Sequence, residues 1–141
     1  MKQDFTQLQL HSSYSLRDST INIDKLIKLA KKQKIKSLAI TDHLNMFAAI
    51  KFYQKCFDNK IKPIIGCQVP LKDKLSNHHL GSVTLLCQNF SGYKNLIKLI
   101  SKIHIQKKPS ENPGATIDQL KQYNEHISVS YTHLTLPTKV E

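Results

Sequence analysis

Side chains that could do chemistry recur at the ends of apolar segments in this 141-residue sequence. His11 follows a short apolar segment, Asp42 and His43 follow a second, and Gln68 follows a third. In barrel-like α/β folds the carboxyl ends of parallel strands converge on one face, and sites are built on that face. We therefore expect these imidazole, carboxylate and amide groups to share one pocket although they are far apart in sequence.

Two common kinds of site find no support in the sequence. Ser12, Ser13 and Ser15 lie near His11, but no GxSxG context and no third partner indicate a hydrolase triad. The sequence also contains no P-loop and no GxGxxG motif, so nucleotide binding through those glycine-rich loops is not predicted.

Length and composition predict one ordinary domain, since 40% of the residues are hydrophobic. No apolar run approaches the roughly 18 residues of a membrane-spanning helix, and the first residues lack the apolar core of a signal peptide. Cys56, Cys67 and Cys87 are odd in number and form no CxxC pair. We therefore expect reduced, structural thiols in a cytoplasmic protein that does not bind a membrane.

The net charge of +11 comes almost entirely from lysine, because Arg17 is the single arginine among 21 basic residues. Bidentate phosphate contacts and base readout favour arginine, so the lysine excess favours a generic solvated surface. It is also what an AT-rich genome would encode. A polyanion-binding module remains the alternative, because clustered cations release counterions from a phosphate backbone.

Strand-like and helix-like segments alternate along the chain. Alternation or solid apolar runs predict strands near residues 8–10, 37–41, 61–65, 83–87 and 127–129, with Gly66 ending the third. Helical spacing predicts helices over 23–30, 49–56 and 93–100, and from 117, with Asn22, Ser91 and Thr116 as N-caps. Residues 72–81 and 107–114 are expected to form loops. Strands separated by helices imply parallel pairing, which both doubly wound sheets and barrels satisfy.

Five segments in consistent order and spacing carry a family resemblance: 5–16, 38–45, 51–53, 61–66 and 91–96. Together they resemble the N-terminal PHP (polymerase and histidinol phosphatase) domain of bacterial DNA polymerase III alpha subunits. The resemblance runs to about Ser128. It implies an α/β fold, namely a partial distorted (β/α)7 PHP barrel with parallel strands alternating with helices.

The resemblance also implies a site, because active PHP domains hold several divalent metals with His, Asp and Glu and hydrolyse phosphoesters. His11, Asp42 and His43 match that pattern. Gln9, Gln68 and Ser82 depart from it, since each places a neutral group where a His or Glu ligand is expected. We expect at most one weakly held zinc or manganese ion, and the residues themselves identify no catalytic group.

The function implied is that of a fragment of a replicative DNA polymerase, a nucleotidyltransferase that needs Mg²⁺ and a DNA template. The fragment itself is expected to be a non-catalytic scaffold that binds the proofreading exonuclease subunit, beside the other replicase subunits. The alternative is a free-standing, metal-dependent PHP phosphoesterase that uses His11, Asp42 and His43.

The resemblance stops close to the end of the sequence. Residues 130–141 are similar to a translated sequencing-adapter tail that recurs in unrelated sequences. We therefore expect residues 1–129 to form a partial PHP domain and residues 130–141 to be a non-native tail.

Overall fold

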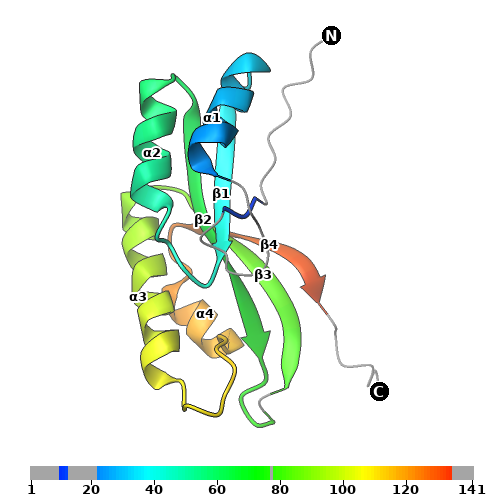
Figure 1. Cartoon of the computed structure of the whole chain (residues 1–141). Coiled ribbons are helices and arrows are strands. Elements are labelled where there is room, and N and C mark those ends of the chain that lie inside the picture. Colours follow the sequence, from blue (N-terminus) through cyan, green and yellow to red (C-terminus); the bar gives the residue numbers. More distant parts are fainter. Residues whose placement is uncertain (1–9, 13–21, 77, 135–141) are drawn as a thin grey trace. The chain divides into compact units, whose positions relative to one another are not determined.

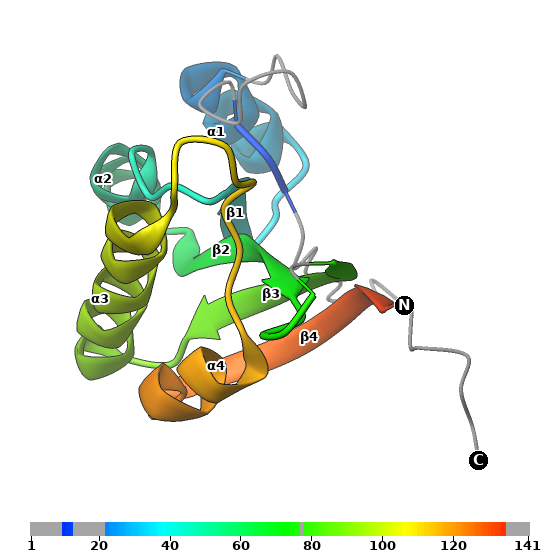
Figure 2. The same cartoon turned by 90° about the horizontal axis from the view of Figure 1, so that it is seen from below.

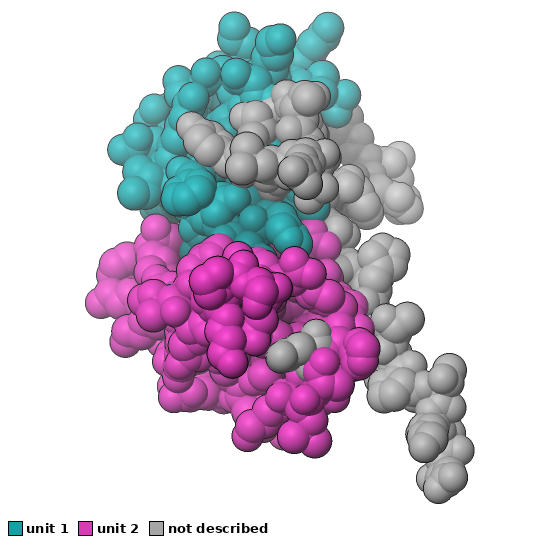
Figure 3. All heavy atoms as spheres, turned by 60° about the horizontal axis from the view of Figure 1, so that its bottom comes forward, with its two compact units in different colours: residues 1–67 teal, residues 68–141 magenta. Residues whose placement is uncertain are grey.

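The computed structural model describes residues 10–12, 22–76 and 78–134 (Figure 1). The chain divides into two compact units, Met1–Cys67 and Gln68–Glu141, which Figure 3 shows in different colours. Strands β1 to β4 are hydrogen-bonded in the order β1-β2-β3-β4 within these described ranges. No helix of the described chain is long and apolar enough to cross a membrane.

The first unit contains helices α1 (Ile23–Lys32) and α2 (Ala49–Asp58), strand β1 (Ser37–His43) and the beginning of strand β2 (Lys62–Lys72). The cap predicted for α1 is confirmed, because the Asn22 side chain accepts a hydrogen bond from the Asp24 N–H at 2.8 Å. The Lys62 N–H donates to the Lys36 carbonyl at 2.8 Å, which places the first residues of β1 and β2 side by side. These two strands are therefore parallel, and α2 makes the crossover between them.

The core of the first unit forms between the two helices and one face of β1. Leu38 and Ile40 alternate on that face and pack with Ile27 of α1 and Phe52 of α2. Cys56 of α2 belongs to the same cluster and is fully buried, which raises the pKa of its thiol to about 11. All three cysteines are free thiols in the structure.

The second unit contains the end of β2, strands β3 (His79–Cys87) and β4 (Ile127–Leu134), and helices α3 (Phe90–Gln106) and α4 (Ile117–Tyr123). A hairpin joins β2 to β3, with the Asp73 N–H donating to the His78 carbonyl at 2.9 Å. Helix α3 packs on β3 and β4 and contacts α4 (Figure 2). The predicted capping box at Thr116 is confirmed, since its side chain and that of Gln119 each bind the other residue's backbone N–H.

The α/β class and the partial barrel are confirmed, but parallel pairing throughout is wrong. β3 pairs with β4 in antiparallel fashion, with Thr84 opposite Ser130 and Cys87 opposite Ile127. The hairpin between β2 and β3 makes that pair antiparallel as well, because a six-residue connection cannot return a strand in the parallel sense. Parallel pairing therefore holds for β1 and β2 alone among the described strand pairs.

Two smaller expectations are also wrong. Strand β2 continues through Gly66 to Lys72, and β3 begins at His79, so the loop between them is shorter than predicted. The cap of α3 is Asn89, not Ser91, because the Asn89 side chain accepts from the Gly92 N–H at 3.0 Å. Strand β4 begins at Ile127 as predicted and continues past residue 129. The prediction that residues 130–141 are a non-native tail stays a prediction.

Gly92, in the first turn of α3, lies against the turn that precedes β4. A Cβ atom on Gly92 would overlap the backbone carbonyl of His126. The same turn is held by the Asn95 side chain, which donates to the Glu125 carbonyl at 3.0 Å, and by the Gln88 N–H, which donates to the His126 carbonyl at 2.9 Å. This close approach of two backbones requires glycine.

Replacing Gly92 with alanine is therefore expected to destabilise the chain, because backbone rather than a flexible side chain must move. We expect Gly92→Ala to lower the free energy of unfolding in urea by about 2–3 kcal/mol. Ser91→Ala, at the exposed neighbouring position, is the control and should change it by less than about 0.5 kcal/mol. Equal effects in the two variants would show that the close approach is not present in solution.

Candidate functional site

The candidate site centres on Asp42, the second-to-last residue of β1. Its side chain is only 2% exposed, so the carboxylate needs hydrogen-bond donors or a counter-charge. Ser12 supplies two donors: its backbone N–H binds Oδ1 at 2.5 Å and its hydroxyl binds Oδ2 at 2.6 Å. Both carboxylate oxygens therefore accept a hydrogen bond from one buried residue, thirty positions earlier in the chain.

The segment Leu10–Ser12 reaches Asp42 because it runs alongside the end of β1. The Thr41 N–H donates to the Leu10 carbonyl at 2.7 Å, and the Leu10 N–H donates to the Thr41 hydroxyl at 3.0 Å. Leu10 also packs against the core between α1 and α2. Backbone pairing and apolar contact thus align the segment, and Ser12 is placed directly at the carboxylate. The expected strand near 8–10 lies mostly outside the described residues.

The two candidate histidines flank this pair in the sequence. His11 precedes Ser12, and its Nε2 is shielded from solvent. His43 ends β1 and is half-buried, and its carbonyl accepts from the Asn45 side chain at 3.1 Å. Leu44 follows in the left-handed region with φ 52°, so the chain turns sharply there. This turn fixes where the last residues of β1 lie relative to α2.

The arrangement does not fit a metal cluster in the part of the chain that the structure describes. No group of three or more His, Cys, Asp or Glu side chains is placed to hold a metal ion there. The weak single-ion site predicted at His11, Asp42 and His43 stays a prediction. The two Ser12 hydrogen bonds use one acceptor site on each Asp42 oxygen. The geometry shows a buried carboxylate that is hydrogen-bonded within the protein.

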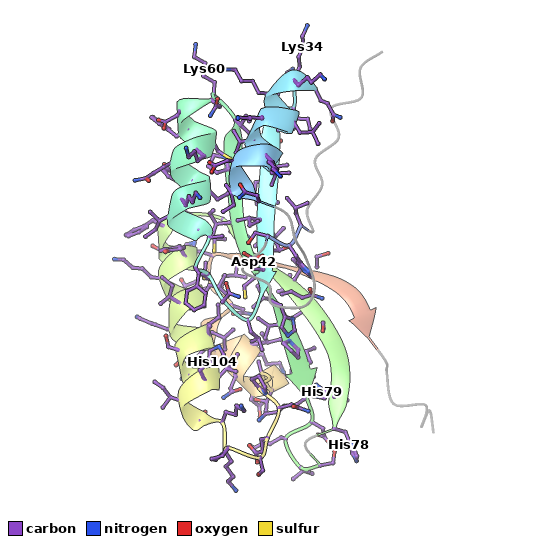
Figure 4. The ribbon with its side chains drawn as sticks, in the orientation of Figure 1. Lys34, Asp42, Lys60, His78, His79 and His104 are labelled. Atoms are coloured by element: carbon purple, nitrogen blue, oxygen red, sulfur yellow. The ribbon has the colours of Figure 1, made fainter. Side chains whose placement is uncertain are left out.

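The other predicted positions fall elsewhere. Gln68 lies on β2 and Ser82 on β3, both half-buried in the second unit, and Ser82 borders an irregularity in the register with β4. Gln9 lies outside the described residues. Figure 4 labels Asp42 in the first unit and the exposed His78 and His79 in the second, where β3 begins.

Sequence reasoning missed the role of Ser12. The sequence suggested this serine only as a nucleophile next to His11, which lacked a triad. The structure shows it as the donor to Asp42 and places it 0% exposed. No local sequence pattern indicates this role, because the role depends on a contact between residues thirty positions apart.

The fold and the strand-end carboxylate agree with a match to a protein family. The PHP domain family matches residues 7–137, and the chain therefore belongs to the PHP domain family. A partial PHP barrel is the class of structure that β1, β2 and their helices build.

Curated relatives carry a more particular name, DNA polymerase III subunit alpha. The Chlamydia trachomatis protein is 40% identical over 106 residues, which cover 67% of this chain and 8% of that protein. The Borreliella burgdorferi protein is 38% identical over 131 residues, covering 87% of this chain and 11% of that protein. The Staphylococcus epidermidis protein is 36% identical over 132 residues, covering 94% and 12%. The chain thus spans about a tenth of the length of these relatives.

Two solved structures share the fold. An amidohydrolase from Chromobacterium violaceum superposes with a TM-score of 0.55 at 19% identity, over 71% of this chain and 33% of that one. A candidate metal-dependent phosphoesterase from Bifidobacterium adolescentis gives a TM-score of 0.51 at 16% identity, over the same shares of the two chains. At these identities the likeness shows the fold alone.

Removing the Asp42 carboxylate should leave two buried donors of Ser12 without an acceptor. We expect Asp42→Ala to lower the free energy of unfolding in urea by about 2–4 kcal/mol, since stranded buried donors carry their full desolvation cost. Ser12→Ala, which keeps the backbone N–H bond, should cost about 1 kcal/mol.

The matched control is Asp118→Ala on α4. That carboxylate is 71% exposed and lies 3.7 Å from the Lys74 amine, so its loss should change stability by less than about 0.5 kcal/mol. If Asp42→Ala were as mild as this control, the Ser12–Asp42 pair would not be a structural element of the first unit.

Proposed function

We propose that this chain is the PHP-domain portion of a DNA polymerase III alpha subunit and that it acts as a non-catalytic scaffold. In this proposal the whole protein extends DNA on a template with Mg²⁺ in the cytoplasm, and its polymerase carboxylates lie outside the 141 residues. The scaffold binds the proofreading exonuclease subunit, next to the other replicase subunits. The names of the relatives support the parent activity.

One observation carries the non-catalytic part of the proposal: few charged groups stand at the ligand positions of the family pattern, and both oxygens of the one matching carboxylate, Asp42, accept hydrogen bonds from Ser12. A hydrolytic metal centre needs anionic ligands that offset the charge of its cations. Here the carboxylate at the end of β1 is engaged within the protein. Two further positions, Gln9 and Gln68, carry neutral amides, and Ser82 carries a hydroxyl. The ligand set that remains is too small and too weakly charged for a polynuclear centre.

The phosphoesterase alternative gives the first test. The purified chain is incubated with p-nitrophenyl phosphate in the presence of Mn²⁺, of Zn²⁺ or of a chelator, beside the His43→Ala variant. The proposal predicts hydrolysis at the background rate in every condition and no difference between the variant and the parent sequence. Hydrolysis that needs Mn²⁺ or Zn²⁺ and is lost in His43→Ala would establish the phosphoesterase and refute the scaffold.

Binding to the exonuclease subunit gives the second test. The immobilised chain is expected to retain the purified proofreading exonuclease subunit of the same replicase, whereas an unrelated lysine-rich protein of similar charge retains none. The comparison is made at two salt concentrations, because non-specific ionic capture weakens with salt. Failure to retain the exonuclease at either concentration would contradict the scaffold role.

A further inference from the structure

Six exposed lysines gather at one end of the first unit, where α1 and α2 end and where β1 and β2 begin. We call this surface the lysine end, and it consists of Lys31, Lys32, Lys34, Lys36, Lys60 and Lys62. It is separate from Asp42, which lies at the opposite end of β1.

The fold brings the two halves of the lysine end together. Because β1 and β2 are parallel neighbours, the α1–β1 and α2–β2 connections lie at the same edge of the sheet. The Lys62 N–H donates to the Lys36 carbonyl at 2.8 Å, which joins them directly. Figure 4 shows Lys34 and Lys60 at this end with their side chains directed away from the ribbon.

Few negative charges offset the lysine end. Residues 22–67 contain three acidic side chains: Asp24, Asp42 and Asp58. Asp42 is buried, and Asp24 lies in the first turn of α1, where it pairs with Lys51 at 3.6 Å and Lys55 at 3.3 Å. The carboxyl ends of α1 and α2 add about half a negative charge each. Together with Asp58 this amounts to about two negative charges against six lysines within residues 22–67, so this described part of the unit carries a net positive charge at the lysine end.

The backbone at two of these positions is unusual for lysine. Lys34 and Lys60 each follow a helix in the left-handed region with φ 57°, where glycine or asparagine is favoured. A side chain with a Cβ is disfavoured there. Both α1 and α2 are nevertheless followed by a lysine in this left-handed conformation. Each of these lysines places a positive charge at the lysine end.

We propose that the lysine end binds the phosphate backbone of duplex DNA without reading its sequence. Lysine is a point charge without the fork of donors that arginine uses for bidentate base contacts. The rings of Tyr53 and Phe57 on α2 are exposed, so the test includes the same strand unpaired, whose bases could stack on them. Point charges on long stems suit phosphate contacts, which give affinity but no sequence selection. This inference goes beyond the scaffold role.

The test is the binding of a short fluorescein-labelled duplex of arbitrary sequence to the 141-residue chain, followed by anisotropy between about 50 and 200 mM salt. A triple variant, Lys34→Asn, Lys60→Asn and Lys62→Gln, removes half of the lysine end and places a favoured residue at both left-handed positions. The matched control removes the same charge from exposed lysines of the second unit, by Lys98→Gln, Lys108→Gln and Lys121→Gln.

We expect the first triple variant to bind about tenfold or more weakly at low salt and the slope of log affinity against log salt to fall by about 3, roughly one unit for each lost phosphate contact. The control variant should lose less than half of that slope. Equal losses in the two variants would show that total charge, and not this end, holds the DNA. Absence of salt-dependent binding by the parent chain, or tighter binding to the same strand unpaired, would also overturn the proposal.

Discussion

The structure of the first unit depends on the need of one buried carboxylate for partners. Asp42 is almost completely shielded, and a buried anion is tolerated only where donors or cations satisfy it. Ser12 provides two donors. Beside them, the Thr41 N–H donates to the Leu10 carbonyl, and the Leu10 N–H donates to the Thr41 hydroxyl. These contacts hold the segment Leu10–Ser12 against β1, so the early part of the chain is fixed to a strand about thirty residues away.

This pairing separates the fold of the PHP family from the metal chemistry that the fold can support. A carboxylate at a strand end can ligate a cation, accept hydrogen bonds from the protein, or do both, and here both of its oxygens accept from Ser12. Neutral residues at Gln9, Gln68 and Ser82 point in the same direction. In the proposed scaffold, the parts of the family pattern that build the barrel are kept, while the charged groups that would hold a metal cluster are reduced.

The sequence predicted what depends on local chemistry. The sequence predicts helix α1 with its Asn22 cap, and the capping box at Thr116, from residues within one helical turn. The apolar run 38–40 predicts β1. The predicted parallel direction of the strands was wrong for β3 and β4. Their antiparallel pairing depends on tertiary packing, which hydrophobic periodicity alone does not predict. Gly66 suggested an end to β2, but the strand continues through it to Lys72. Asp42 was named as a site residue, but its partner Ser12 was not.

In the proposed scaffold, the Asp42 carboxylate binds Ser12 and holds no metal ion. We would titrate the ¹⁵N-labelled chain with Mn²⁺ and follow the paramagnetic broadening of its backbone amide resonances. Our account predicts that Ser12 and Asp42 broaden no more at stoichiometric Mn²⁺ than the buried residues of β1 around them. Selective loss of the signals of Ser12, Asp42 and His43 at that ratio would show a metal at the end of β1 and would contradict the account.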